Sequence, residues 1–197
     1  MEGRFALGQD PADSRAAWNF LPVSEGDLPA YVATGTRAYT DHYCHLWPGG
    51  NPRPYLSRNF TLPLARSQLR DPACRLWLIR EGDQAAGICK LVLDRDLPGS
   101  PPGRSVFIEK VYFIRSFTGR GMGTALLGEI GRFAGESGRD VLWLEAMQKG
   151  PALAFYLKNG FVRVSQTRIP YPEVLPDEKM MWVLKRELKG SGLPSPR

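Results

Sequence analysis

Residues 115–124, a glycine-rich segment, are the part of the sequence best suited to binding a ligand. The segment reads Arg-Ser-Phe-Thr-Gly-Arg-Gly-Met-Gly-Thr and connects a strongly β-prone stretch to a helical one. Gly119, Gly121 and Gly123 remove side chains where a backbone would wrap closely around a ligand. A helix N-terminus presents unpaired N–H groups and a partial positive charge, and Arg120 adds a full charge. The pattern predicts an anion cradle suited to a pyrophosphate. The alternative interpretation is a tight strand-to-helix connection with flexible glycines.

Two other phosphate-binding motifs do not fit this segment. A Walker loop would close with a lysine, whereas Gly123 is followed by Thr124 and Ala125. A Rossmann fingerprint usually lies near the start of its domain and has an acidic ribose partner about 20 residues further on. This segment lies in the second half of the chain, and Asp140 opens the next expected strand instead of ending it.

The segment and its surroundings resemble the GNAT superfamily of N-acetyltransferases. That family's motif runs from a strand through Gln/Arg-x-x-Gly-x-Gly/Ala into a helix, and residues 118–123 are similar to it. The family's next strand and its Ala-x-x-Phe-Tyr helix are similar to residues 142–145 and 151–161. The resemblance covers residues 15–188. Thr118 and Gly150 depart from it, because the family usually has Gln or Arg at the first position and many members have Asn at the second.

The front half is similar to one branch of the superfamily, the PaiA-like polyamine acetyltransferases. The similarity is carried by residues 40–46, 55–61, 69–72, 75–78 and 116–119. This resemblance implies transfer of an acetyl group from acetyl-CoA to a primary amine, by direct attack in a ternary complex. The acceptor is expected to be a small molecule such as a polyamine. Peptide N-termini, lysine side chains, amino sugars and antibiotics stay open as other acceptor classes.

The resemblance also implies a fold and a cofactor site. The expected fold is α/β (α+β), a mixed, mostly antiparallel sheet of six to seven strands, with a V-shaped splay between the fourth and fifth strands and helices on both faces. The pantetheine arm would lie along the fourth strand like an added strand. A backbone N–H near Val111 would face the thioester oxygen, a contact worth about 2.7–4 kcal/mol in the barrier. The expected cofactor-binding residues are Val111, Tyr112, Phe113, Thr118, Gly119, Arg120, Gly121, Met122, Gly123, Thr124 and Tyr156.

Glu109 is the expected base that removes the proton from the amine. Strand alternation predicts one shared face for Phe107, Glu109, Val111 and Phe113. A carboxylate between apolar neighbours should have a raised pKa, which suits a base at neutral pH. The alternative is an exposed or salt-bridged glutamate on a sheet edge, with Arg163 as a partner.

Tyr156 is the expected acid that protonates the departing sulfur. A phenol with a pKa near 10 can donate to a thiolate whose thiol has a pKa near 8.5. A core tyrosine on a short amphipathic helix is the alternative. Glu145 lies across the splay, and two roles are expected for it. It binds the amine or acts as a second base, or it has only a structural role and pairs with a nearby Lys or Arg. The acceptor side should be lined from Tyr39, His42, Tyr43, His45 and Trp47, with no catalytic role for either histidine.

The elements that must position these residues alternate between helical and extended patterns. Apolar positions three to four apart, helix caps and turn signals predict the helices, and β-branched or alternating stretches predict the strands. Helices are expected over residues 27–43, 62–69, 120–136 and 151–158. Strands are expected over residues 18–23, 75–80, 85–93, 105–114, 140–147, 161–165 and 179–185. Residues 47–54 are expected to form a loop, because their prolines and glycines break regular structure. Residues 1–14 are expected to be a flexible lead-in, residues 15–188 the GNAT domain, and residues 189–197 a flexible tail.

Composition is that of a globular chain: 197 residues, 43% hydrophobic and 23% charged. No apolar run approaches the roughly 20 residues of a membrane helix, and no signal peptide is visible, so a cytoplasmic location and no membrane partner are expected. Three cysteines and two histidines argue against a disulfide framework and a metal site. The net charge of +6 is spread along the chain, which suits an anionic cofactor better than nucleic acid. A homodimer is possible. A non-catalytic GNAT-like CoA-binding sensor or regulator is the alternative function.

Overall fold

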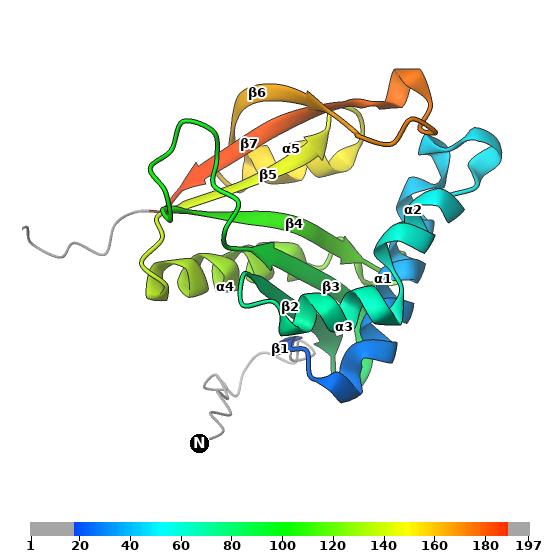
Figure 1. The fold of residues 1–197 in the computed structure, drawn as a ribbon, viewed down its shortest axis with the longest axis horizontal. Coiled ribbons are helices and arrows are strands. Elements are labelled where there is room, and N and C mark those ends of the chain that lie inside the picture. The colour runs from blue at the N-terminus through cyan, green and yellow to red at the C-terminus, as the bar shows by residue number, and fades with distance from the viewer. Residues whose placement is uncertain (1–17, 189–197) are drawn as a thin grey trace, which may run out of the picture.

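A single twisted sheet with helices on both of its faces forms the protein, as the computed structural model shows for residues 18–188 (Figure 1). The expected lead-in of residues 1–14 and the expected tail of residues 189–197 lie outside the described residues. Residues 15–17 of the expected domain lie outside them as well.

Residues 18–113 supply three helices and the first half of the sheet. The helices are α1 (Leu28–Tyr43), α2 (Arg53–Asn59) and α3 (Leu62–Arg70). The strands are β1 (Trp18–Pro22), β2 (Cys74–Glu81), β3 (Gln84–Val92) and β4 (Ser105–Phe113). The sequence predicted a loop where α2 begins, because proline and glycine are dense there. Pro52 is in fact the N-cap of α2 and Pro54 lies in its first turn, where proline costs a helix no hydrogen bond.

Residues 122–187 supply the second half. The helices are α4 (Met122–Glu136) and α5 (Pro151–Lys158), and the strands are β5 (Val141–Met147), β6 (Val162–Arg168) and β7 (Met180–Glu187). β5 is buried at Leu142, Trp143 and Leu144 in succession, so both of its faces are covered, as its continuous apolar sequence predicts. α5 ends at Lys158, and Gly160 (φ 83°) provides the left-handed residue after it.

Within residues 18–188 the sheet has seven strands in the order β1-β2-β3-β4-β5-β7-β6. Neighbouring strands are antiparallel except β4 and β5, which are parallel. The parallel pair lies where the α4 crossover joins the two strands. The expected mixed, mostly antiparallel fold with helices on both faces is confirmed.

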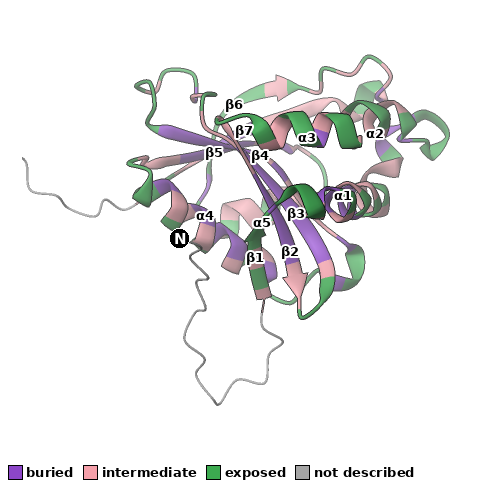
Figure 2. Ribbon diagram, turned by 60° about the horizontal axis from the view of Figure 1, so that its bottom comes forward, coloured by how far each residue is buried: buried purple, intermediate pink, exposed green. Residues whose placement is uncertain are grey.

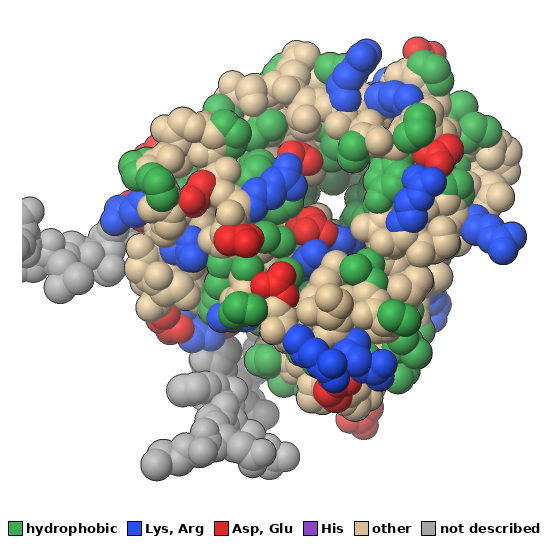
Figure 3. Space-filling view, viewed as in Figure 1, with side chains coloured by type: hydrophobic (Ala, Val, Ile, Leu, Met, Phe, Trp, Pro, Cys, Tyr) green, Lys and Arg blue, Asp and Glu red, His purple; other side chains and the backbone are tan. Residues whose placement is uncertain are grey.

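The β4–β5 pair separates after a short contact. Pairing joins Ser105 to Val141, Val106 to Leu142, and Phe107 to Trp143, and then ends. Residues 108–113 of β4 and residues 144–147 of β5 continue without pairing to each other, and each strand stays attached to its other neighbour. Figure 1 shows the two strands diverging, and Figure 3 shows an opening in the surface between them. The predicted V-shaped splay between the fourth and fifth strands is therefore present.

The two larger of three apolar clusters cover the two faces of the sheet. The core on one face, called the α4 core, packs α4 against residues such as Ile79, Cys89 and Ile108. The core on the other face, called the α1 core, packs α1 and its neighbours against residues such as Leu78 and Ile88. Figure 2 shows the central strands buried between helices whose outer sides are exposed. The glycine-rich segment therefore enters α4 on one face of the split sheet, and α1 packs on the other face.

A β-bulge in β4 overturns the expected alternation. Lys90 of β3 pairs with Lys110, but its neighbour Leu91 pairs with Ile108, so Glu109 has no partner on β3. After this extra residue the side chains change face. Phe107 packs beside Trp143 on the α1 side, while Val111 lies opposite Cys89 and packs against the α4 core. The prediction that Phe107, Glu109, Val111 and Phe113 share one face is wrong, because the bulge divides them.

Among residues 18–188, no helix is long and apolar enough to cross a membrane.

Candidate active site

The glycine loop forms a tight, left-handed entry into α4. Gly119 has φ 78° and Gly121, the N-cap residue, has φ 90°, a region that L side chains rarely adopt. A Cβ built on Gly119 would meet no atom within 4 Å, so this part of the loop borders open space. A Cβ on Gly123 would lie 2.9 Å from Cζ of Phe155, so that glycine is needed for α4 to approach α5. The glycines therefore serve both backbone shape and close packing.

The first turn of α4 leaves its donors for a ligand. The first N–H of the helix with a main-chain acceptor is that of Ala125, which donates to Gly121 O at 3.1 Å. The N–H groups of residues 122–124 precede it and have no acceptor inside a helix. No side chain caps this end and no acidic residue lies in the first turn. The arrangement favours an anionic ligand at this end of α4.

Side chains around the loop hold it in place. The guanidinium of Arg120 donates to Glu81 Oε2 at 2.8 Å and to Ser116 O at 2.9 Å. Glu81 also accepts from Trp18 Nε1 at 3.2 Å, which ties β1 and β2 to the loop. Thr118 Oγ1 donates to the carbonyl of Arg115 at 2.8 Å. The hydroxyl of Thr118 therefore stabilises the turn, and the charge of Arg120 is shared with Glu81.

Met122 and Thr124 differ in what they can offer a ligand. The side chain of Met122 is 1% exposed and belongs to the α4 core, so only its backbone N–H faces outward. Thr124 is exposed in the same turn. The expected contacts of the loop are therefore mainly main-chain contacts.

The open end of β4 directs backbone groups into the split. Ile114 N donates to Ala86 O at 2.8 Å, so the main chain of residue 114 faces β3. Because main-chain direction alternates along an antiparallel pair, Tyr112 also faces β3, whereas Val111 and Phe113 face the side that β5 has left. The carbonyl of Phe113 accepts a hydrogen bond from His42 Nε2 of α1 at 3.1 Å. We infer that the N–H of Val111 points into the split. The main-chain groups of Tyr112 point toward β3 instead.

Tyr156 lies on α5 beside this backbone. Its ring contacts Phe155 and Phe161, and the side chain packs against the α4 core together with Val111 and Phe113. No hydrogen bond joins its hydroxyl to another of the described residues. Burial raises the pKa of Tyr156, and the neighbouring Tyr43 and Cys89 add to the rise. The phenol therefore keeps its proton at neutral pH and has it free to donate.

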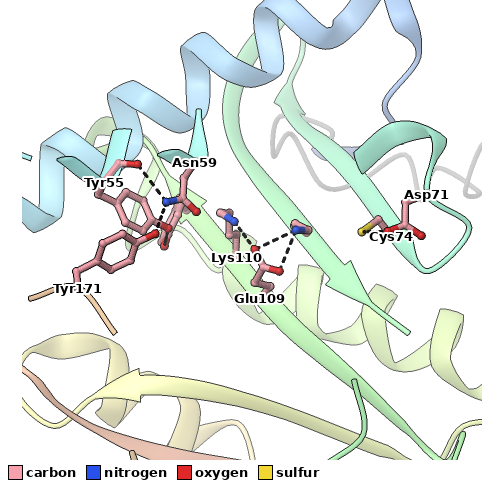
Figure 4. Close-up of polar contacts among 9 residues, drawn as sticks. Tyr55, Asn59, Asp71, Cys74, Glu109, Lys110 and Tyr171 are labelled. Atoms are coloured by element: carbon pink, nitrogen blue, oxygen red, sulfur yellow. Dashed lines mark hydrogen bonds and ion pairs between the residues drawn. The ribbon is translucent and has the colours of Figure 1, made fainter. Parts of the chain in front are cut away.

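Glu109 lies in an ion-pair cluster on the α1 side of the sheet (Figure 4). Lys90 Nζ lies 2.9 Å from Glu109 Oε2 and 3.1 Å from Oε1, and Lys110 Nζ contacts Oε1. Although burial alone would raise it, the pKa of Glu109 is lowered, because the two ammonium groups outweigh burial. The expected raised pKa is therefore wrong. The partners of Glu109 are two lysines, while Arg163 instead lies over the ring of Trp182.

Glu145 and Arg95 form a second ion pair, at the narrow end of the split. Arg95 Nη2 lies 2.7 Å from Glu145 Oε1. The guanidinium stacks over the rings of Phe107 and Trp143, at 4.0 Å and 5.0 Å from their centroids. Phe107 and Trp143 are the last pair that joins β4 to β5. Glu145 therefore pairs with an arginine, one of the two outcomes expected for it.

The five residues expected to line the acceptor side do not lie together in one group. Tyr39 and Trp47 are 4% and 2% exposed and belong to the α1 core, where Trp47 Nε1 donates to Tyr39 Oη at 3.1 Å. His45 is exposed on the surface, and His42 has the structural hydrogen bond to β4 described above. Tyr43 lies near both β4 and α5, since its ring contacts Tyr112 and it raises the pKa of Tyr156.

A bridge of side-chain and main-chain contacts closes the wide end of the split. Asn59 Nδ2 of α2 donates to Tyr171 Oη at 2.6 Å, and Arg58 pairs with Glu173 at 2.7 Å. Leu175 N donates to Leu46 O at 2.9 Å. These contacts join the front helices to the β6–β7 connection. We call them the α2 bridge.

Sequence reasoning missed several of these groups. Lys90 and Lys110 each interrupt an apolar strand, which is a visible signal of a buried charge that needs a partner. Arg95, Asn59 and Tyr171 lie in loops or at a helix end, and only the tertiary structure brings them to the split. Within residues 18–188, no group of three or more His, Cys, Asp or Glu residues could hold a metal ion.

The unpaired N–H groups of α4, the glycine surface and the open β4 backbone together fit a pyrophosphate joined to an extended amide-bearing arm.

Comparison with known proteins gives a consistent result. Residues 37–161, more than half of the chain, match the Acetyltransferase (GNAT) family. A protein of Lactobacillus delbrueckii subsp. lactis, named an uncharacterized N-acetyltransferase in the pepI 3′ region, is 26% identical over 151 residues, covering 74% of this chain and 85% of that protein.

Solved structures share the fold at low sequence identity. The PaiA N-acetyltransferase of Thermoplasma acidophilum, in complex with coenzyme A, is 11% identical with a TM-score of 0.69 and covers 87% of this chain and 99% of its own. The ribosomal-protein-S18-alanine N-acetyltransferase of Escherichia coli is 16% identical with a TM-score of 0.65, covering 92% and 100%.

Proposed function

Because the chain belongs to the GNAT family of acetyltransferases, we propose that it transfers an acetyl group from acetyl-CoA to a primary amine. The observation that carries the proposal is the presence of two sets of main-chain donors without a partner among the described residues. One set is the first turn of α4, and the other is the open edge of β4. The first suits the pyrophosphate of coenzyme A, and the second suits its pantetheine arm.

Acetyl-CoA would supply the activated acetyl group, and the residues of this chain would act around it. The N–H of Val111 would stabilise the negative charge that develops on the carbonyl oxygen, a contact of about 2.7–4 kcal/mol in such sites. Tyr156 would donate its proton to the sulfur. The raised pKa makes the Tyr156 phenol a weaker acid. Burial raises the proton affinity of a thiolate in the same environment too, so the transfer from phenol to sulfur stays feasible.

Glu109 is the proposed group that receives the proton of the acceptor amine. It lies two residues before Val111 and is 28% exposed, on the α1 side of the split. Glu145 is the second carboxylate on this side, and its pairing with Arg95 makes it a weaker candidate.

The proposed acceptor is a small primary amine that meets acetyl-CoA in a ternary complex. The resemblance of the front half to the PaiA-like branch supports polyamines as the first class to test, and the shared fold of the PaiA N-acetyltransferase is consistent with it. The cytoplasmic location and the homodimer stay predictions from the sequence.

Two observations favour a second function, a CoA-binding sensor without catalysis. Both carboxylates beside the split are held by cations, which weakens each of them as a base. Thr118 and Gly150 also depart from the family pattern at two cofactor positions.

A thiol-release assay over several classes of amine separates the two functions. The transferase is expected to release coenzyme A with at least one class. We expect Tyr156→Phe and Glu109→Gln each to lower kcat by about 10²-fold or more, because each removes a proton-transfer group. Binding of coenzyme A, measured by calorimetry, should change little in both variants. Tight binding without turnover of any amine would instead support the sensor, and near-normal rates in both variants would remove the catalytic assignments.

A further inference from the structure

The cluster of Lys90, Glu109 and Lys110 exists because of the bulge in β4. In a regular strand, Glu109 and Lys110 would point to opposite faces. The extra residue turns both side chains to the face of Lys90, and all three charged groups meet there. Bulges recur next to active sites, where they redirect a side chain. This one lies next to Val111, the residue whose N–H points into the split.

The charges of the cluster do not balance when all three groups are ionised. Two ammonium groups share one carboxylate, which leaves a net charge of +1. The side chains of Lys90 and Lys110 are 7% and 3% exposed, so water can offset little of that charge. Among residues 18–188, Glu109 is the only acceptor that either ammonium group contacts. A buried charge without a partner costs several kcal/mol, so the cluster favours the loss of one proton.

Neighbouring elements supply no anion that would offset the charge. The titratable groups facing the cluster from other elements are Cys74 of β2, Tyr31 of α1 and Tyr55 of α2, with the exposed Asp71 behind Cys74. Burial raises the pKa of the thiol and of both phenols, so they stay neutral at physiological pH. Asp71 contacts Cys74 and not an ammonium group.

Lys110 is the lysine better placed to be neutral. Lys90 contacts both oxygens of Glu109, whereas Lys110 contacts one and is the more buried of the two. Burial lowers the pKa of Lys110, and Lys90 adds to the fall while Glu109 opposes it. A neutral Lys110 beside an ionised Lys90–Glu109 pair leaves the cluster without net charge.

Resting on the proposed function, we propose that Lys110 takes up, through Glu109, the proton that the acceptor ammonium releases before its nitrogen attacks. In this step R–NH3+ and the Lys110 amine become R–NH2 and the Lys110 ammonium. The Glu109 carboxylate gains and loses the same proton, and Lys90 takes no part in the transfer. Lys110 afterwards returns its proton to solvent, which is the one proton that acetylation of an ammonium releases overall. Glu109 can then pass protons on even though its own pKa is low, because it need not hold them.

Arginine substitutions at the two lysines separate this proposal from a simple ion pair. Arginine keeps a positive charge but is never neutral in proteins. We expect Lys110→Arg and Lys110→Met each to lower kcat by about 10²-fold. Lys90→Arg keeps the permanent counter-charge, so its loss should be at least tenfold smaller than that of Lys110→Arg. An alkoxyamine, which is already neutral at the assay pH, should shrink the defect of both Lys110 variants, because no ammonium proton has to be removed.

The measurements are kcat against pH with an amine that the wild-type protein acetylates, together with coenzyme A binding and Tm for each variant. Wild-type activity in Lys110→Arg, or equal losses in Lys110→Arg and Lys90→Arg, would overturn the role of Lys110 and leave the transferase intact. Failure of the wild-type protein to acetylate any amine would instead remove the proposed function, and this inference with it. Should Lys110→Arg not fold, full activity in Lys110→Met would also overturn the proposal.

Discussion

Substitution of Gly121 by alanine tests whether the left-handed entry into α4 serves both folding and cofactor binding. Gly121 has φ 90° and ψ −9°, where a Cβ costs about 1–2 kcal/mol. The new Cβ would also approach Trp18 Cη2 to 3.4 Å, a contact that the indole can absorb by a small shift. If the loop keeps its shape, the free energy of unfolding falls by about 1–2 kcal/mol, or about 2–8 °C in Tm.

The loop can also relieve this strain by rotating, and then the cost passes to binding. The N–H groups at the start of α4 would turn away from the pyrophosphate. The same 1–2 kcal/mol corresponds to a weakening of coenzyme A binding by up to about 30-fold. Thermal unfolding measures the loss of stability, and calorimetric titration with coenzyme A measures the loss of binding free energy. The sum of the two losses should equal the strain of about 1–2 kcal/mol that the backbone angles of Gly121 predict.

Gly128 provides a matched control in the same helix. It is exposed in the middle of α4, has no positive φ, and a Cβ there meets no atom within 4 Å. Gly128→Ala should therefore raise stability by about 1 kcal/mol, the difference in helix propensity, and leave binding unchanged. A Gly121→Ala protein with the Tm and the coenzyme A affinity of the wild type would refute the reasoning.

Three further predictions concern packing, ionic strength and pH. Gly123→Ala should destabilise the protein by about 1–3 kcal/mol, because its Cβ would lie 2.9 Å from Phe155, and adding Phe155→Leu should recover part of the loss in thermal melts. Arg120→Ala should weaken coenzyme A binding by less than about 1 kcal/mol at low salt, since this guanidinium is half exposed and shared with Glu81, and by less still at high salt; a larger, salt-independent loss would contradict the exposed geometry. The lowered pKa of Glu109 means that its ion pairs stabilise the fold above about pH 4.5, its ordinary value, and that this stability is lost as pH falls through the lower folded-state value. Urea unfolding across pH should therefore show the gap between wild type and Glu109→Gln narrowing below about pH 4.5, and a constant gap would argue against the ion pairs.

Local patterns predicted the elements that depend on neighbours in sequence. Helix α4 follows from apolar positions such as Met122, Leu126 and Ile130, all of which lie in the α4 core. The glycine loop was also readable, because the left-handed angles at Gly119 and Gly121 require glycine. The loop predicted at the proline-rich start of α2 is wrong, since prolines that break the interior of a helix also fit its first turn.

The details of the site depend on contacts between distant strands, which a single sequence does not display. The bulge at Glu109 is a property of how β4 aligns with β3, so alternation along β4 alone gave the wrong face for Val111 and Phe113. The same shift brings two lysines to the carboxylate and reverses the predicted direction of its pKa. The position of β7 between β5 and β6 likewise comes from the tertiary fold.

The α2 bridge limits how the two substrates of the proposed reaction would approach the split. The Asn59–Tyr171 and Leu46–Leu175 hydrogen bonds join the two sides at the wide end of the split, which leaves the two faces of the sheet as the open approaches to it. In the proposed reaction the nucleotide would approach past α4, and the amine would approach past α1 on the opposite face of the sheet. With separate approaches, neither product of the proposed reaction would obstruct the exit of the other, so the acetylated amine and free coenzyme A would need no fixed order of release.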